Sequence, residues 1–345
     1  MQIRRQSLAV ARKTVLVAAG VAALLGYQIS APVGAAAQGP AAAPKRMVTQ
    51  GPATKVVVEN MYQCPVPVDN YRPSSVGQIT AADGTTITVP TVTAYQKGLG
   101  PKASDLYNEC TQVMPQKASD ASTAKVPIIE VDKGGDVITG YIVADNYYEM
   151  YVNGTLVSVD NTPYTPFNST IVKFRAKRPY TIAFLVVDWD AHLGQGMEVF
   201  PNTPAGKDWY PGDAGLIAHF SDGTVTDSNW KAQSFYIAPL NSADEVVENG
   251  NVHDTTALGR VHPVAKKPEC HEKCYAVHYP IPAGWQSRMF DDSTWPRAYE
   301  YTDIDIGTTA LPAYTRYPEL FAGARWIWSV NLVFDNVVIA RRTVR

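Results

Sequence analysis

The side chains best suited to chemistry lie in one stretch near the middle of the sequence. Asp188-Trp189-Asp190 is followed by Glu198 and then by Trp209-Tyr210. The apolar face of a sugar stacks on an indole or phenol ring, and its hydroxyls pair with carboxylate oxygens. We therefore predict one ligand-binding set, which comprises Asp188, Trp189, Asp190, Glu198, Trp209 and Tyr210. The alternative is that Trp189 fills the end of a hydrophobic core and that the aspartates are only solvated.

The carboxylates of this set could also supply the acid pair of a glycosidase. Charged residues make up 18% of the chain, however, so acidic clusters of this kind arise by chance. The sequence contains no G-x-S-x-G elbow, no H-E-x-x-H, no P-loop and no G-x-G-x-x-G after a predicted strand. We predict no catalytic residue and keep a glycoside-active enzyme as the less favoured alternative.

The four cysteines form an even set, which in an oxidising compartment indicates disulfides. Three pairings are possible, and we favour Cys64 with Cys110 and Cys270 with Cys274. The rival for the second pair is a metal site, because an imidazole and a carboxylate stand between these two thiols. The spacing matches neither a zinc knuckle nor a haem attachment site, so we predict a disulfide loop without metal.

No cofactor is predicted from the sequence. Asp136, Asp145 and Asp160 could contribute to a structural calcium ion, which takes six to eight oxygen ligands. Their spacing does not specify such a site.

The N-terminus has the pattern of an export signal. Arg4, Arg5, Arg12 and Lys13 precede an uncharged apolar run from 14 to 26, which is shorter than the roughly 20 residues of a membrane-spanning helix. A small-residue site at 35–37 follows, so we predict a signal peptide over 1–37 and a periplasmic or extracellular, secreted protein. The two arginines leave both the general secretory and the twin-arginine route open.

Composition narrows the class of partner. The formal charge of -2 is spread without basic blocks, which argues against nucleic acid, and no second apolar run could span a membrane in the mature protein. The chain has 19 Tyr, 7 Trp, 25 Pro and 24 Gly, a mixture typical of all-β proteins with many turns. The oligomeric state is not indicated.

Three segments follow the leader. Residues 38–55 are rich in Ala, Pro and Gly and predict a flexible lead-in, and residues 56–125 predict an irregular extension. Residues 126–345 predict an antiparallel β-sandwich with long loops. Its clearest strands span 137–143, 147–152, 155–159, 170–176 and 180–188, and Asn153-Gly154 predicts a tight hairpin turn. Alternation along 147–152 suggests a strand with a packed core on one side only.

A family resemblance appears in this region. The run 144–154, A-D-N-Y-Y-E-M-Y-V-N-G, is similar to a hairpin of galactose-binding-like modules attached to glycoside hydrolases. The runs 226–231 (T-D-S-N-W-K) and 290–296 (F-D-D-S-T-W-P) resemble segments of accessory domains in rhamnosidase-like and galactosidase-like enzymes. The resemblance covers about residues 134–345 and implies a jelly-roll fold. It departs from the family because R-W-I-W at 325–328 closes the chain and no catalytic domain follows.

The resemblance implies carbohydrate binding without catalysis, and the partner would be a carbohydrate or another cell-envelope component. In the motifs themselves, Asp227 and Asp291 are expected to accept backbone hydrogen bonds in turns that orient Trp230 and Trp295 into the core. Fold likeness does not supply function. The main alternative is therefore a structural or assembly protein of the cell envelope, whose loops make protein contacts.

Overall fold

A computed structural model describes residues 45–68, 71–164, 167–199, 209–262, 264–265 and 268–345. The chain forms two compact units, Met1–Ala42 and Ala43–Arg345, and all described residues belong to the second. The predicted signal peptide, residues 1–37, lies outside the described residues.

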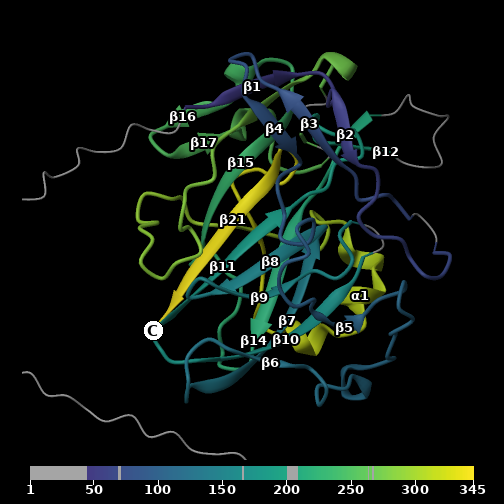
Figure 1. The fold of residues 1–345 in the computed structure, drawn as a ribbon, viewed down its shortest axis with the longest axis vertical. Helices are drawn as coiled ribbons and strands as arrows, with labels where there is room; N and C mark the ends of the chain where they lie inside the picture. The colour runs from purple at the N-terminus through teal and green to yellow at the C-terminus, as the bar shows by residue number, and fades with distance from the viewer. Residues whose placement is uncertain (1–44, 69–70, 165–166, 200–208, 263, 266–267) are drawn as a thin grey trace, which may run out of the picture. The chain divides into compact units, whose positions relative to one another are not determined.

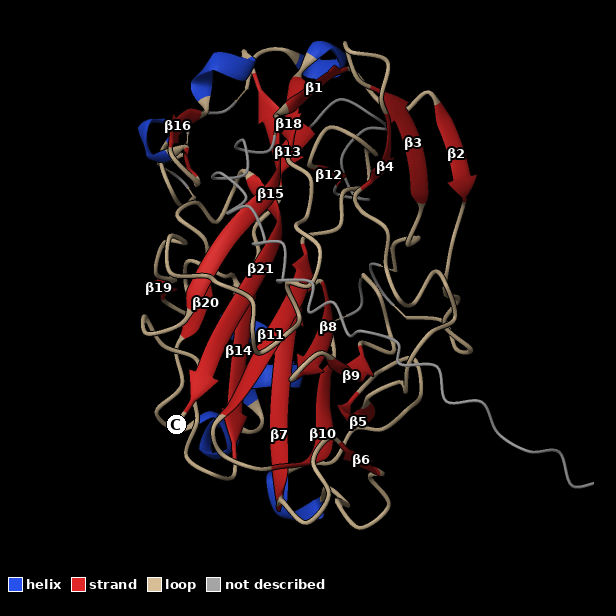
Figure 2. Ribbon diagram, turned by 60° about the vertical axis from the view of Figure 1, so that its left-hand side comes forward, coloured by secondary structure: helices blue, strands red, loops and turns tan. Residues whose placement is uncertain are grey.

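Two large sheets dominate the described unit (Figures 1 and 2). Sheet 1 is antiparallel throughout, and its C-terminal strand lies at its centre. Its strands, in spatial order, are β1 (Met47–Gln50), β18 (Tyr275–His278), β15 (Lys231–Leu240), β21 (Asp335–Val344), β11 (Tyr180–Val187), β8 (Tyr147–Val152) and β9 (Thr155–Val159). The segment after R-W-I-W thus supplies the central strand of this sheet.

Sheet 2 packs against sheet 1 and encloses the core. Its strands, in spatial order, are β19 (Tyr299–Tyr301), β20 (Trp326–Trp328), β14 (Gly215–Phe220), β7 (Asp136–Asp145), β10 (Ser169–Ala176) and β5 (Ser104–Tyr107). A short strand, β6 (Ile128–Glu130), adds a parallel pair to β10. The predicted all-β, antiparallel sandwich is confirmed.

Consecutive strands mostly lie in different sheets. For example, β7 belongs to sheet 2 and β8 to sheet 1, and likewise β10 belongs to sheet 2 and β11 to sheet 1. The hydroxyls of Tyr148 on β8 and Thr170 on β10 meet across the core at 2.6 Å. The hairpin β8–β9 turns at Asn153 and Gly154, whose φ angles of 51° and 89° fit the predicted tight turn. Strand locations were therefore predictable, whereas their sheet membership was not.

Strand β8 is buried on both faces, which corrects the expectation of a core on one side only. Tyr148, Met150 and Val152 face the core, as alternation predicts, but Tyr147 and Glu149 are also buried. A segment distant in sequence covers the second face of β8. Ala94 donates its backbone N–H to Glu149, and Tyr95 donates its backbone N–H to the Tyr147 hydroxyl.

The N-terminal residues of the unit are more regular than the sequence suggests. Strand β1 lies within the expected flexible lead-in, yet it pairs with β18 over four residues. β2 (Lys55–Val58), β3 (Val76–Thr80) and β4 (Thr86–Val89) form a small antiparallel sheet of their own. These pairings supply hydrogen bonds from distant residues, which local composition does not reveal.

Short elements complete the unit. The loops carry two small hairpins, β12 (Met197–Val199) with β13 (Trp209–Pro211) and β16 (Val247–Asn249) with β17 (Val252–Asp254). One α-helical turn, α1 (Pro312–Thr315), and six short 3-10 helices, η1 (Ala118–Asp120), η2 (Ala243–Glu245), η3 (Thr256–Leu258), η4 (His271–Lys273), η5 (Thr308–Ala310) and η6 (Pro318–Phe321), are present in the described residues. None of these helices has the length and apolar character that crossing a membrane requires.

Both predicted disulfides are formed, Cys64 with Cys110 and Cys270 with Cys274. The turn motifs also act as predicted. Asp227 Oδ1 accepts the backbone N–H of Asn229, and Asp291 Oδ1 accepts that of Ser293.

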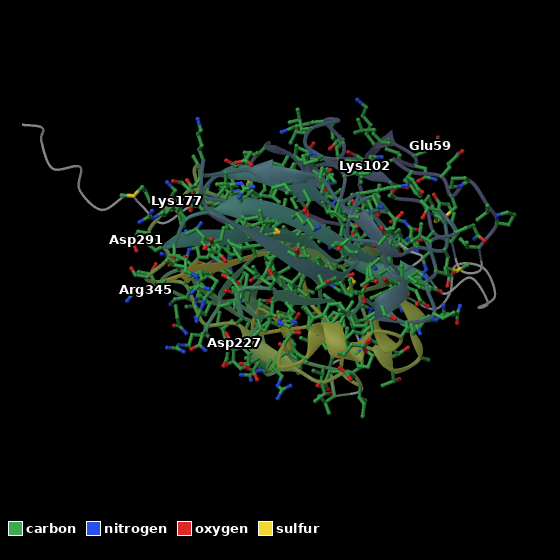
Figure 3. All side chains as sticks on the ribbon, turned by 90° about the horizontal axis from the view of Figure 1, so that it is seen from below. Glu59, Lys102, Lys177, Asp227, Asp291 and Arg345 are labelled. Atoms are coloured by element: carbon green, nitrogen blue, oxygen red, sulfur yellow. A yellow bond between two sulfur atoms is a disulfide. The ribbon has the colours of Figure 1, made fainter. Side chains whose placement is uncertain are left out.

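Charged side chains of both signs lie around the periphery of the described unit (Figure 3). Those labelled in this view are Glu59, Lys102, Lys177, Asp227, Asp291 and Arg345.

Candidate functional site

Trp189 is completely buried and therefore offers no ring face to a ligand. Its indole N–H donates to the carbonyl of Ser75 at 2.9 Å, and its ring meets that of Tyr147 edge-on at 5.9 Å. The core-filling alternative describes this residue better than the ligand-stacking one, because solvent does not reach the ring.

Asp190 is also buried, and its role is local. Its Oδ2 accepts hydrogen bonds from the backbone of Gly194 at 2.9 Å and Gly196 at 3.0 Å and from the Tyr236 hydroxyl at 2.9 Å. Burial is the main cause that raises its pKa to about 6, and these donors oppose the rise. The carboxylate thus organises the loop after β11.

Asp188 and Glu198 do lie near each other, as the sequence suggested, and the fold adds Asp145 and Asp213. Burial raises the pKa of Asp188 well above its ordinary value, and the charges of Glu198, Asp145 and Asp213 raise it further. Arg72 partly offsets the negative charge of the cluster, since its guanidinium lies 2.6 Å from Glu198 Oε2. The cluster therefore carries fewer charges at neutral pH than its four carboxyl groups would suggest.

The remaining two predicted residues, Trp209 and Tyr210, belong to β13. Their backbones pair with Val199 and Glu198 of β12. Their side chains lie outside the described residues.

The three aspartates considered for calcium do not share one site. Asp136 and Asp145 begin and end β7, so nine residues of extended chain, about 30 Å, separate them. Asp160 is buried and accepts from the Thr162 backbone and the Asn168 amide. Among the described residues no group of three or more His, Cys, Asp or Glu has the arrangement of a metal site.

The buried cluster makes a prediction about pH. Burial and Glu198 raise the pKa of Asp213 from 3.8 to about 7, so the folded state holds a proton that the unfolded chain has lost between these values. The contribution of this group to stability is therefore full below about pH 4 and is lost as pH rises toward 7.

Asp213→Asn removes the ionisation and should flatten this dependence. We expect the variant to match the parent near pH 3.5 but to exceed its free energy of unfolding by about 1–3 kcal/mol near pH 8. Urea unfolding at both pH values measures the difference. An equal difference at both values would mean that hydrogen bonding, and not charge, is responsible.

A more open site lies elsewhere, on the outer face of sheet 1. A cavity of about 420 Å³, here called cavity 1, has its floor on β8, β11, β21 and β15. The segment 87–99 forms one wall and the segment 281–286 another. This volume is within the usual range of small-ligand sites, roughly 300–1,000 Å³.

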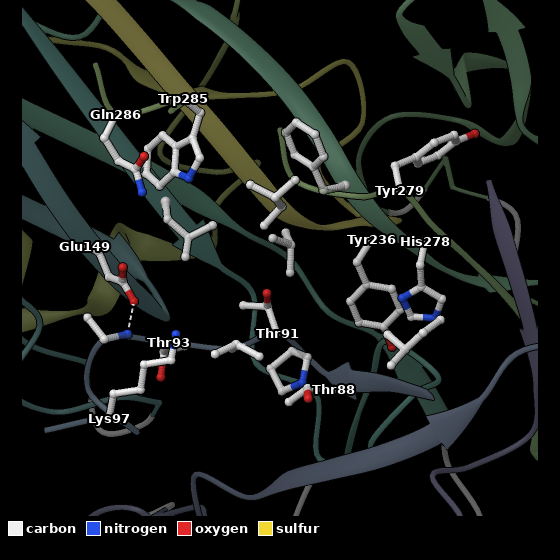
Figure 4. A pocket seen from close by; sticks show the side chains of 18 of the residues that line it. Thr88, Thr91, Thr93, Lys97, Glu149, Tyr236, His278, Tyr279, Trp285 and Gln286 are labelled. Atoms are coloured by element: carbon white, nitrogen blue, oxygen red, sulfur yellow. Dashed lines mark hydrogen bonds between the residues drawn. The ribbon is translucent and has the colours of Figure 1, made fainter. Parts of the chain in front are cut away.

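Figure 4 shows Glu149, Lys97, Trp285 and Gln286 toward one end of cavity 1. Tyr151 and Trp285 pack edge-to-face there, with ring centres 5.1 Å apart. Tyr151 donates its hydroxyl to Glu149 Oε2 at 2.7 Å, so the carboxylate fixes the orientation of the phenol ring.

The opposite end of cavity 1 carries Tyr236, His278 and Tyr279 (Figure 4). The ring of His278 stacks on Tyr236 at 4.6 Å, and its Nε2 lies 3.1 Å from the Thr49 hydroxyl. Burial lowers the pKa of His278 to about 3, so this ring is neutral at physiological pH.

None of these residues belongs to the predicted ligand-binding set. Tyr151 and Glu149 lie inside the A-D-N motif, which indicates the fold alone. The signal in the sequence is the polar side of the alternating β8 strand. Local sequence does not reveal the site because its walls come from segments about 50–60 residues before β8 and about 130 residues after it.

No protein-family model matches this sequence, and no curated protein or solved structure shows significant similarity to it.

Proposed function

We propose that this protein is an exported, non-catalytic carbohydrate-binding protein of the periplasm or the extracellular space, and that it binds its ligand in cavity 1. The observation that carries the proposal is the half-buried ring of Tyr151, which packs edge-to-face on Trp285, beside uncharged donors and acceptors in a cavity of about 420 Å³. Rings offer surface to the apolar side of a sugar, and amide and hydroxyl groups pair with its hydroxyls.

The polar groups at the cavity support a neutral ligand. Gln286, Thr88 and Thr91 carry no charge. Burial raises the pKa of Glu149, and the hydrogen bond from Ala94 and the charge of Lys97 oppose this rise. The positive charge of Lys97 and the negative charge of Glu149 therefore balance in cavity 1.

Support also comes from the likeness of the A-D-N, T-D-S-N-W and F-D-D-S-T-W segments to galactose-binding-like modules. The proposed site differs from the loop after β11, where Asp188, Trp189 and Asp190 are buried. The carboxylates of Asp188 and Asp190 do not line cavity 1, so they would contact neither a sugar bound there nor its glycosidic bond.

Filling cavity 1 tests the proposal. Val92 lines the cavity and is 44% exposed, so Val92→Trp should obstruct the cavity without disturbing the core. We expect glycan-array screening to find a neutral ligand for the parent protein and titration calorimetry to show a loss of affinity of roughly tenfold or more in the variant.

The matched control is Val56→Trp, because Val56 is 53% exposed on β2 and does not line cavity 1. It should bind like the parent. Absence of any glycan binding by the parent, together with concentration-dependent self-association, would contradict the proposal and favour the assembly protein instead.

A further inference from the structure

A second cavity lies beside the first on the outer face of sheet 1. Its volume is about 440 Å³, and we call it cavity 2. Phe235, Tyr279 and Ile281 line both cavities, so the two lie on either side of these three side chains. Figure 4 shows one of these residues, Tyr279, at one end of cavity 1.

Two buried polar side chains, Gln233 and His253, line cavity 2. The amide of Gln233 lies 2.7 Å from Nδ1 of His253, which also lies 2.8 Å from the Ser234 carbonyl. These contacts hold the amide and the imidazole in place in the wall of the cavity.

The other walls of cavity 2 suit a sugar as well. The half-buried ring of Phe290 packs edge-to-face on the core residue Trp295, with ring centres 5.3 Å apart. Asn251 donates to the Thr294 hydroxyl at 2.9 Å near the exposed rim. Cavity 2 thus repeats the combination found in cavity 1, an aromatic pair beside uncharged polar groups.

Charge indicates which sugars fit. The titratable groups at cavity 2 are Glu248, Asp291 and His253, and burial lowers the pKa of His253 to about 4, so that ring is neutral. With the balanced charges of cavity 1, the pair of cavities is neutral to acidic and would repel a polyanionic chain.

We propose that the two cavities are adjacent subsites for one neutral oligosaccharide, which crosses over Tyr279 and Phe235. This proposal rests on the proposed function. It implies that affinity increases with chain length, because a monosaccharide fills one cavity and leaves the other empty.

The experiment is calorimetric titration with neutral ladders of the cello-, xylo- and manno-series, from monosaccharide to hexasaccharide, beside an oligogalacturonate ladder. Ala283 is exposed at the rim of cavity 2, so Ala283→Trp obstructs that cavity alone. The matched control is Ala82→Trp, at an exposed turn residue that lines neither cavity.

We expect affinity for one neutral series to rise by roughly tenfold or more between monosaccharide and tetrasaccharide. Ala283→Trp should lose this gain and keep monosaccharide affinity, whereas Ala82→Trp should behave like the parent. Oligogalacturonates should bind more weakly at every length.

Three results would overturn the inference. Equal affinity at all lengths, with no effect of Ala283→Trp, removes the second subsite but leaves carbohydrate binding in cavity 1 intact. Loss of monosaccharide binding in Ala283→Trp places the primary site in cavity 2. Stronger binding of oligogalacturonates refutes the neutral class. Absence of binding to any ladder refutes carbohydrate binding itself, which the first three results do not.

Discussion

Replacing Trp189 by Ala should lower the free energy of unfolding by about 3–5 kcal/mol, the usual cost of truncating a large buried aromatic side chain. Trp189 is 0% exposed, so the substitution leaves a cavity that the surrounding strands cannot close fully. It also removes the donor to the Ser75 carbonyl and so releases the segment before β3 from the sandwich. Chemical unfolding measured by tryptophan fluorescence and circular dichroism would give the value.

Trp189→Phe separates the two effects. The phenyl ring fills much of the space but cannot donate a hydrogen bond, so we expect an intermediate loss of about 1–2 kcal/mol. Unchanged stability in Trp189→Ala, with lost glycan binding, would instead restore Trp189 to the ligand-binding set and displace cavity 1 as the site.

The second large effect should come from Arg341, which is 1% exposed on β21. Its guanidinium donates to Asp292 Oδ2 at 2.7 Å, to the Ser287 carbonyl at 3.2 Å and to the Trp285 carbonyl. A single side chain thus fastens the loop 285–292 to the outer face of sheet 1. Arg341→Met should cost about 3–5 kcal/mol, because it leaves a carboxylate and buried carbonyls without their donor.

The loop that Arg341 holds contributes Trp285 and Gln286 to cavity 1 and Phe290 and Asp291 to cavity 2. Arg341→Met should therefore weaken glycan binding as well as stability. Arg341→Lys should not restore either, since an ammonium lacks the planar fork that reaches several acceptors at once.

Arg342→Met is the matched control. Arg342 is only half-buried and donates to the Asn229 carbonyl at 2.8 Å, so its loss should cost at most about 1 kcal/mol. Calorimetric melting of the three variants compares them directly. Similar melting temperatures for Arg341→Met and Arg342→Met would show that the loop is held by other contacts.

Local patterns in the sequence determined the strands and their turns. The β-branched and aromatic runs predict the bounds of β7 to β11 within one residue, except that β7 extends two residues further at its C-terminal end, and the Asn153-Gly154 turn is correct. These features depend on side-chain alternation of period two and on the φ preferences of a few neighbouring residues. Both disulfides were also predicted, from the count and spacing of the cysteines.

Tertiary structure decided which side chains face solvent. Trp189 and Asp188 follow a strand and looked available, but contacts with Ser75, Tyr147 and Gly212 bury them. In the same way, cavity 1 exists only because segment 87–99 crosses the outer face of sheet 1 and Arg341 holds the 285–292 loop beside it. Such contacts join residues 24 to 114 positions apart, and no local periodicity records them, because burial depends on the distant partner as much as on the residue itself.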